Sequence, residues 1–297
     1  MKNILLFGSS TKTGQYIKSN FSEFFRNSKI YSFTSKKSSA FYLDLKTYII
    51  PDKVNFNKEY IIISLAPLWI FVPYLESFLK SKDINRKNIL GIIVTSSTSV
   101  ITKKYCWNEF DNKLYKKLSF WEEKLFNINR KYNIKLTLLR PTLIYDDIGK
   151  NSDKNVSVLL KVMRNTFILP FPKNTGLRQP IHFSQLGQSI LSISKSYFSD
   201  KSKKGGVEVL NLGGDEELTY GEILYRIKKS YSKSRNINCI LLKIPNKLFF
   251  LLCIPIIIIS PRFYEAIQRI TINMNGFTKS HEISGKEKKK FPVKYYK

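Results

Sequence analysis

The chain has 297 residues, of which 43% are hydrophobic and 14% aromatic. This is enough apolar material for one large α/β unit and a smaller lobe, and it excludes a disordered chain. With three widely spaced cysteines and two histidines, the chain offers neither a disulfide framework nor a cysteine-based metal site, so we expect no metal and a reducing, cytoplasmic compartment.

The formal net charge of +28 at pH 7 raises the question of a nucleic-acid partner. The basic residues are mostly lysines spread along the whole chain, and no helix-turn-helix, zinc-finger or RNP-like pattern accompanies them. We therefore interpret them as a solvated surface and expect no specific nucleic-acid partner. Attraction to anionic ligands, such as nucleotide substrates or membrane headgroups, stays open, and the sequence is silent on the oligomeric state.

Up to Tyr145, short apolar runs alternate with stretches that carry apolar residues at helical spacing. This alternation predicts a doubly wound, Rossmann-type parallel sheet with helices on both faces. The predicted strands are Asn3–Phe7, Lys29–Phe33, Tyr60–Leu65, Ile89–Thr95 and Lys135–Leu139, and the predicted helices are Gln15–Phe25, Leu68–Lys80 and Glu109–Asn129.

After Tyr145 the pattern changes to that of a smaller, mixed α/β lobe. The predicted helices here are Val156–Thr166, Ser184–Phe198 and Thr219–Ser230, the predicted strands are Val207–Leu212 and Cys239–Lys243, and Ile168–Gln179 is a Pro/Gly-rich connection. We expect a dinucleotide-binding domain over 1–145, joined by strand elements from 180–212. A substrate lobe over 146–276 and a loosely ordered basic tail over 277–297 complete the expected organisation.

The most apolar stretch is Leu248–Ile259, which Pro255 interrupts and which Lys247 and Arg262 bound. At about a dozen residues it is too short for a bilayer span, which needs about 20. We expect a core helix of the smaller lobe. The alternative is an interfacial anchor at the inner face of a membrane, because cationic flanks beside an apolar surface suit anionic lipid.

The segment from Ile4 to Gly14 predicts a strand, a tight turn and a helix start. Such a turn places backbone N–H groups and the positive end of a helix against a pyrophosphate. Gly8 would allow the tight turn, and Gly14 would allow the helix to pack closely against the strand. Thr11 stands at the middle position, where the usual pattern has a glycine. We expect a nicotinamide cofactor at Gly8, Ser10, Thr11, Thr13 and Gly14, with an ordinary strand–helix turn as the alternative.

The end of the predicted second strand reads Thr34-Ser35-Lys36-Lys37, with no acidic residue nearby. An acid there would bind the adenosine ribose and favour NAD, whereas hydroxyl groups and lysines suit a 2′-phosphate. We expect Ser35 and Lys36 to contact the cofactor, which is NADP or NAD with NADP slightly favoured.

Six further segments follow the glycine turn in an order that resembles a known family. They are Asp44-Leu45, Ser64-Leu65-Ala66-Pro67, Thr95-Ser96-Ser97-Thr98-Ser99-Val100, Leu139-Arg140-Pro141-Thr142-Leu143-Ile144-Tyr145, Pro180-Ile181-His182-Phe183-Ser184-Gln185-Leu186 and Asn211-Leu212-Gly213-Gly214. From Lys2 to about Leu218 the chain resembles the extended, and more closely the atypical, short-chain dehydrogenase/reductase superfamily, in its NAD-dependent epimerase/dehydratase branch. The resemblance implies cofactor contacts by Asp44, Leu65, Ala66, Pro67 and Pro141.

In that family a Tyr-x-x-x-Lys pair on a helix transfers the proton. With the register set by Glu123, Tyr115 takes the tyrosine position and Ser119 stands where the lysine belongs. The resemblance makes Tyr115 and Ser97 the candidate catalytic residues, with a half-exposed helix tyrosine and a buried strand serine as the structural alternatives. Serine cannot supply the positive field of a lysine, so proton transfer by the family's route is in doubt.

Substrate contacts are expected from Ser99 and Arg178, since a guanidinium suits phosphate oxygens; an exposed loop arginine is the alternative for Arg178. His182 is expected to be a structural hinge residue. The resulting hypothesis is an NAD(P)-dependent oxidoreductase or epimerase acting on a nucleotide-linked sugar or similar polar substrate. The alternative is a catalytically impaired, NAD(P)-binding regulatory or scaffold protein, with or without peripheral membrane contact.

Overall fold

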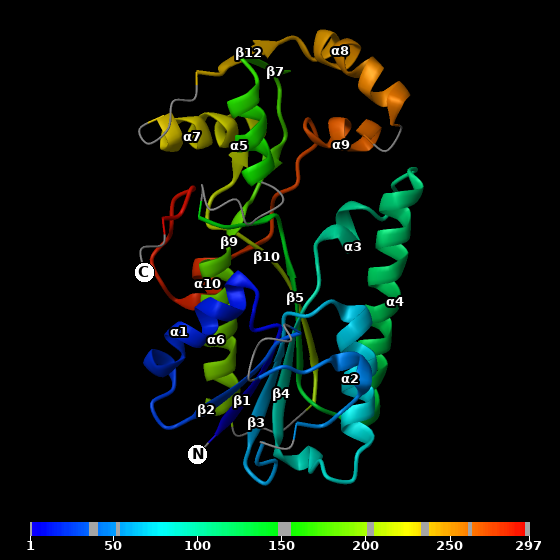
Figure 1. Ribbon diagram of the computed structural model, residues 1–297, viewed down its shortest axis with the longest axis vertical. Helices are drawn as coiled ribbons and strands as arrows, with labels where there is room; N and C mark the ends of the chain where they lie inside the picture. The colour runs from blue at the N-terminus through cyan, green and yellow to red at the C-terminus, as the bar shows by residue number, and fades with distance from the viewer. Residues whose placement is uncertain are drawn as a thin grey trace.

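The computed structural model describes residues 2–35, 41–51, 54–147, 156–200, 205–232, 238–260 and 263–294. A parallel sheet with the strand order β13-β10-β5-β4-β3-β1-β2 forms the centre of the larger part of the molecule (Figure 1). This arrangement confirms the predicted Rossmann-type α/β fold. Its strands are β1 (Asn3–Phe7), β2 (Lys29–Phe33), β3 (Tyr60–Ser64), β4 (Ile89–Thr95), β5 (Leu136–Pro141), β10 (Val207–Gly213) and β13 (Thr278–Lys279).

Helices cover both faces of this sheet (Figure 1). Since a parallel sheet is buried on both sides, its central strands read as continuous apolar runs, and every residue of β1 and β3 is buried. One face carries α1 (Lys12–Phe24), α6 (Phe183–Ser199) and α10 (Ser280–Ser284), and the other carries α2 (Leu68–Lys80) and α4 (Glu109–Tyr132).

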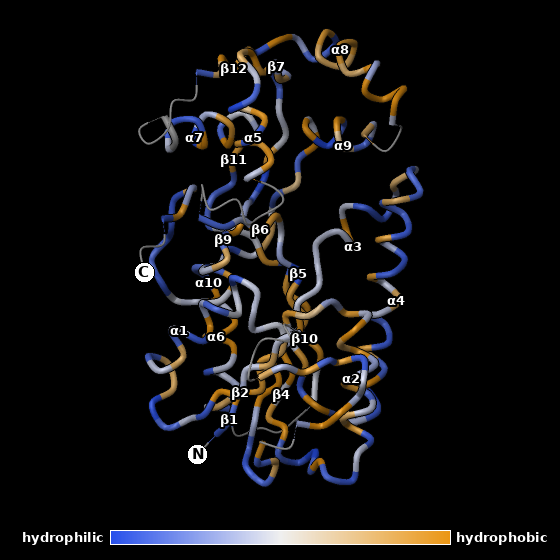
Figure 2. Tube along the Cα trace, viewed as in Figure 1, coloured by the Kyte–Doolittle hydropathy of each residue, from blue (hydrophilic) through white to orange (hydrophobic). Residues whose placement is uncertain are grey.

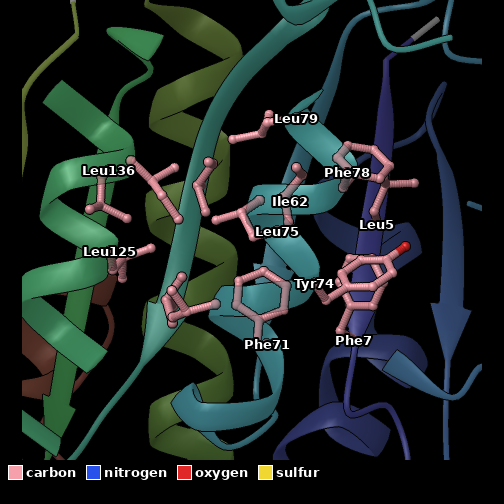
Figure 3. Close-up of a cluster of buried hydrophobic side chains, with 14 of the residues drawn as sticks. Leu5, Phe7, Ile62, Phe71, Tyr74, Leu75, Phe78, Leu79, Leu125 and Leu136 are labelled. Atoms are coloured by element: carbon pink, nitrogen blue, oxygen red, sulfur yellow. The ribbon is translucent and has the colours of Figure 1, made fainter. Parts of the chain in front are cut away.

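The α2 face of the sheet contains the largest apolar cluster. Figure 3 shows Phe71, Leu75 and Phe78 of α2 gathered beside Ile62 of β3 and Leu5 of β1, all of them fully buried or nearly so. These side chains recur at i, i+4 and i+7, the spacing that places them on one side of a helix. This packing holds the carboxyl ends of the strands, where the candidate site lies, in a fixed arrangement.

The smaller lobe contains its own apolar cluster, which includes Leu160, Met163 and Ile227. The expected connection at Ile168–Gln179 forms strands instead: β7 pairs in parallel with β12, and β8 pairs antiparallel with β11. The helices of this lobe and of the connections to it are α3 (Ser99–Thr102), α5 (Val156–Asn165), α7 (Tyr220–Ser232), α8 (Asn246–Ile259) and α9 (Phe263–Arg269). The strands are β6 (Ile144–Tyr145), β7 (Ile168–Pro172), β8 (Leu177–Arg178), β9 (Ile181–His182), β11 (Leu218–Thr219) and β12 (Ile240–Ile244). The larger part also contains two 3-10 turns, η1 (Leu45–Thr47) and η2 (Arg86–Asn88).

The segment 277–294 forms ordered backbone, against the expectation of a loose tail over 277–297. It supplies β13 at one edge of the sheet, and α10 packs on α6. The buried Asp215 carboxylate holds it, accepting hydrogen bonds from the Ser280 hydroxyl (2.6 Å) and from the backbone N–H groups of His281 and Lys289 (2.9 Å each). A buried carboxylate with several N–H and O–H donors is a strong local anchor, so the lysines of this segment lie on ordered backbone.

The expectation of a core helix at Leu248–Ile259 is wrong. Helix α8 forms there, but only Phe249 and Cys253 are buried, whereas Ile258 is 74% exposed and Ile259 84%. The reason is the small size of the lobe, whose cluster at this point reaches only one side of the helix. Among the described residues, no helix is both long and apolar enough to cross a bilayer.

Candidate cofactor and substrate site

The turn between β1 and α1 is built around two glycines and a threonine. Gly8 has a φ of +81°, a conformation that costs glycine nothing. Thr11 caps α1, because its hydroxyl oxygen accepts from the Gly14 N–H at 3.0 Å and its hydroxyl donates to the Gly8 carbonyl at 2.9 Å. A Cβ on Gly14 would lie 2.7 Å from the Gly8 carbonyl oxygen. The turn therefore needs glycine at both ends, and Thr11 closes it in place of a third glycine.

The first-turn N–H groups of α1, those of Lys12 and Thr13, have no partner within the helix, as in any helix start. They lie at the positive end of the helix dipole. Thr13 also contributes to the wall of a cleft in front of the turn. This combination is suited to an anionic group such as a pyrophosphate.

Two clefts meet in front of this turn, at the carboxyl edge of the sheet. One has a volume of about 390 Å³ and the other about 360 Å³, and Ala66 and Pro67 line both of them. The first cleft is lined mainly by Phe7, Gly8, Phe33, Thr34, Ser35, Tyr42, Leu43, Asp44, Leu45, Lys46 and Ile70, and the second by Thr11, Thr13, Leu65, Leu68, Trp69, Thr95, Ser96, Ser97, Ser99, Leu114, Leu118, Pro141, Ile144 and Leu186. Two connected clefts at this edge are where open α/β sheets bind extended ligands.

Most of the cofactor residues predicted from the sequence thus come together. Gly8, Ser35 and Asp44 line the first cleft, and Thr11 and Thr13 the second. Leu65, Ala66, Pro67 and Pro141 also line one or both, while Ser10 lies in the turn itself and Lys36 lies outside the described residues. The Asp44 carboxylate accepts from the Lys46 N–H at 3.0 Å, which holds its side chain beside the first cleft.

The α4 side chains that line the second cleft differ from the pair that the sequence predicts as catalytic. The α4 side chains that line it are Leu114 and Leu118, one helical turn apart. Tyr115 and Ser119 are half-buried on α4 and do not line the cleft. The structure therefore gives no support for Tyr115 as a catalytic residue. The described residues that line this cleft include no acid, base, tyrosine or cysteine.

Glu122 is a buried acid of α4, whereas the helix register predicted from the sequence uses Glu123 as its reference. The Glu122 carboxylate is 2% exposed and accepts from Arg140 Nε at 3.1 Å, from Arg140 Nη2 at 2.5 Å and from the Ser96 hydroxyl at 2.5 Å. The neighbouring Glu123 pairs at the surface with Arg130. Glu122 is thus the acid that joins α4 to β5, and counting from it moves the helix pair from Tyr115 and Ser119 to the two leucines.

Hydroxyl groups supply the polar wall of the second cleft. Ser97 and Ser99 lie side by side, with their oxygens 3.1 Å apart, and the Ser97 oxygen accepts from the Ser99 N–H at 3.1 Å. The Thr95 hydroxyl donates to the Ser64 carbonyl at 3.1 Å. The two serines can therefore hold a polar ligand, although neither has a base beside it.

Arg178 and His182 have structural partners. The Arg178 guanidinium donates to the backbone carbonyls of Leu177 (2.8 Å), Ile272 (2.5 Å) and Arg269, so it holds the chain beyond α9 instead of facing a cleft. The expected substrate contact of Arg178 is not supported. His182 is fully buried and caps α6, and burial lowers its pKa to about 4. It is therefore neutral near pH 7, as a structural hinge residue should be.

A larger groove of about 900 Å³ lies between the two lobes. It adjoins the second cleft through α3, because Ser99 lines the cleft while Ile101 and Thr102 line the groove. On one side stand Tyr105, 81% exposed, and Trp107, 96% exposed; the other side is α9 and the segment after it. The groove is thus an open, aromatic-walled space next to the second cleft.

A group of charged side chains joins α4 to α9 beside this groove. Asp111 of α4 pairs with Arg269 of α9 (2.8 Å) and with Lys103. Burial alone would raise the pKa of Asp111, but hydrogen bonds from Lys103, Asn108 and Arg269 outweigh it and lower the pKa to about 2. Glu265 of α9 binds the backbone of Trp107 and the Asn108 side chain. Cys106 lies close to both carboxylates, a grouping of three potential metal ligands that the sequence did not predict, but the carboxylates are already bonded to cations and N–H donors.

No family model matches the chain, and no curated protein matches it significantly. Among solved structures, UDP-N-acetylglucosamine 4-epimerase from Bacillus cereus is 15% identical, with a TM-score of 0.54, covering 82% of this chain and 85% of that one. RMD from Pseudomonas aeruginosa, complexed with NADPH, is 11% identical with a TM-score of 0.59 and covers 96% and 93%. A short-chain dehydrogenase/reductase protein from Agrobacterium tumefaciens with bound NAD is 12% identical with a TM-score of 0.57, covering 82% and 86%.

The chain shares its fold with these solved structures, which include an epimerase and a short-chain dehydrogenase/reductase protein. At these identities the likeness establishes the fold and leaves the chemistry to the residues of the site. The fold part of the sequence resemblance is confirmed.

Proposed function

We propose that this chain binds a nicotinamide dinucleotide across the two connected clefts. The observation that carries the proposal is their meeting at Ala66 and Pro67, directly in front of the Gly8 turn and the start of α1. The adenosine half would occupy the Asp44 cleft, the pyrophosphate the helix start, and the nicotinamide half the cleft at Pro141. The glycine at position 14 fits this use, since any Cβ there would push α1 away from the turn.

We infer a preference for NADP over NAD from the first cleft. Thr34 and Ser35 stand at the end of β2, where a carboxylate would bind the ribose of NAD. Lys46 also lines this cleft and offers a positive charge that suits a 2′-phosphate. Calorimetry with the four nicotinamide dinucleotides, oxidised and reduced, tests both statements. Tighter binding of NADP forms is expected; association with none of the four refutes the cofactor proposal.

The substrate proposed is a nucleotide-linked sugar or a similar polar molecule that lies in the groove between the lobes. The exposed rings of Tyr105 and Trp107 could stack on a base, and Ser97 and Ser99 could hold a sugar hydroxyl beside the cofactor. The excess of basic residues would attract its phosphates. Solved structures with this fold include enzymes named for such substrates.

The chemistry proposed is that of an NAD(P)-dependent oxidoreductase or epimerase that lacks the usual proton relay. The cofactor, when bound, supplies hydride transfer. The chain's own residues bind and orient: Ser97 and Ser99 donate hydrogen bonds, and Leu114 and Leu118 exclude water from the second cleft. Because none of the described residues that line this cleft is an acid, base, tyrosine or cysteine, we infer slow turnover. The second candidate, a cofactor-binding regulatory protein, is favoured by the same two leucines.

Rebuilding the relay separates these two candidates. Leu114→Tyr with Leu118→Lys places the phenol and the ammonium one helical turn apart on the side of α4 that lines the cleft. We expect this double variant to gain cofactor-dependent turnover of a nucleotide sugar by about 100-fold over the parent chain. Tyr115→Phe is the matched control and should change nothing. A loss of activity in Tyr115→Phe would restore Tyr115 as the acid and refute the leucine register.

A further inference from the structure

Helix α8 presents a broad apolar surface at the tip of the smaller lobe, the end most distant from the sheet (Figures 1 and 2). It is apolar all round rather than on one side, and it buries only Phe249 and Cys253. Helices of this kind normally lie in a protein core or in lipid. We define the α8 surface by its exposed residues: Leu248 (43%), Leu251 (60%), Leu252 (54%), Ile254 (45%), Ile256 (49%), Ile258 (74%) and Ile259 (84%).

Other exposed apolar side chains lie on elements that contact α8. The paired strands β7 and β12 expose Ile168 (47%), Ile240 (46%) and Leu242 (46%), and β7 packs against α8. Helix α9, which also packs on α8, exposes Phe263 and Tyr264. Soluble monomers seldom expose apolar side chains in such number at one place, so this end of the molecule is suited to bind a partner.

The charge of the same segment identifies the chemistry of that partner. Between Glu222 and Glu265 the sequence contains no acidic residue, and its basic residues are Arg226, Lys228, Lys229, Lys233, Arg235, Lys243, Lys247 and Arg262. A cationic, acid-free segment with an apolar helix complements a surface of anionic lipid headgroups over hydrocarbon. A second copy of the chain would bring two such segments together and oppose them by repulsion.

We propose that the protein docks on an anionic membrane surface through α8, with the helix in the plane of the interface. The helix has 14 residues, or about 21 Å at 1.5 Å per residue, and hydrocarbon is about 30 Å thick. It therefore enters the headgroup region without spanning the bilayer. Lys243 and Lys247, just before and at the start of α8, would contact the headgroups. This docking does not depend on the proposed cofactor or substrate.

Vesicle flotation of the full chain tests the proposal directly. The probes are vesicles of phosphatidylcholine alone and of phosphatidylcholine with about 30% phosphatidylglycerol, at low and high salt. The test variant is Ile258→Gln with Ile259→Gln. The matched control is Ile49→Gln with Phe120→Gln, which removes two exposed apolar side chains (57% and 53%) from the larger part of the molecule. Circular dichroism melts verify that each variant is folded.

We expect the parent chain and the control to bind anionic vesicles, and the α8 variant to bind about tenfold more weakly or worse. Binding should fall with salt and be weak on phosphatidylcholine alone. Absence of vesicle binding at low salt, or equal binding by the folded α8 variant, overturns the proposal. So does sedimentation showing a dimer that only the α8 variant loses, which would assign the surface to a second copy instead.

Discussion

Glu122 and Glu123 are adjacent carboxylates on α4 in opposite environments, and replacing each by glutamine should have very different costs. Glu122 is 2% exposed and binds two nitrogens of Arg140, whose side chain is itself only 17% exposed. Glu123 pairs with Arg130 at the surface, where the side chains are 60% and 65% exposed. Glutamine keeps the volume in both cases and removes one negative charge.

Breaking a buried ion pair leaves the remaining charge uncompensated, so Glu122→Gln should lower the free energy of unfolding by about 3–5 kcal/mol. Loss of the exposed pair should cost about 1 kcal/mol or less, because solvent screens it. Urea unfolding followed by circular dichroism measures both, with equal m-values as the check on two-state behaviour. Equal costs for the two variants, or a cost below about 1 kcal/mol for Glu122→Gln, would refute the assignment of Glu122 as the acid that joins α4 to β5.

Three further predictions follow from the same structure. Gly14→Ala, whose Cβ would meet the Gly8 carbonyl oxygen at 2.7 Å, should destabilise the fold by about 1–3 kcal/mol and weaken dinucleotide binding in calorimetry, whereas Gly206→Ala, with open space around it, should do neither. His182 has a pKa of about 4 in the folded protein, below its ordinary 6.5, so the stability it contributes is complete above pH 6.5 and is lost as the pH falls toward 4. His182→Asn can still cap α6 and should make the melting temperature nearly independent of pH across that window. Asp111 has a pKa of about 2 in the folded protein, below its ordinary 3.8, so it contributes about 2 kcal/mol of stability at pH 7 that is lost only below about pH 4. In chemical unfolding at pH 7, Asp111→Asn should lower the free energy of unfolding by this amount. Above pH 5 the dependence of that free energy on pH should keep its shape.

The central sheet could be predicted from the sequence because parallel strands leave the clearest pattern. β1, β2 and β4 begin and end where the apolar runs predict, and α2 does so over Leu68–Lys80. Each strand of a covered sheet is buried on both faces, so its composition alone marks it. The turn between β1 and α1 could also be predicted from the sequence, because Gly8 has a positive φ and a Cβ on Gly14 would clash with the Gly8 carbonyl oxygen.

The misplaced elements depended on contacts distant in sequence. β13 is two residues long, too short for any periodicity, and its position depends on Asp215, which lies more than sixty residues earlier and binds Ser280 and His281. The burial of α8 was misjudged because composition shows that a helix is apolar and does not show how much core is available to cover it. The small cluster around Cys253 covers only one side.

Helix α4 shows how much of the candidate site depends on a register of one residue. Neighbouring residues of a helix point about 100° apart, so choosing Glu123 over Glu122 as the reference acid predicts a different face of α4 toward the second cleft. The two acids look alike in sequence, and the inward-packing apolar residues Leu114, Leu118, Trp121 and Leu125 recur at i, i+4, i+7 and i+11. The buried residues Asp111, Leu118, Glu122 and Leu125 recur at an equally regular spacing. Tyr115 is half-buried and lies two helical turns before the buried Glu122, so the spacing of buried residues along α4 does not by itself exclude it. The choice between the two registers therefore rests on which α4 side chains line the second cleft, and these are Leu114 and Leu118.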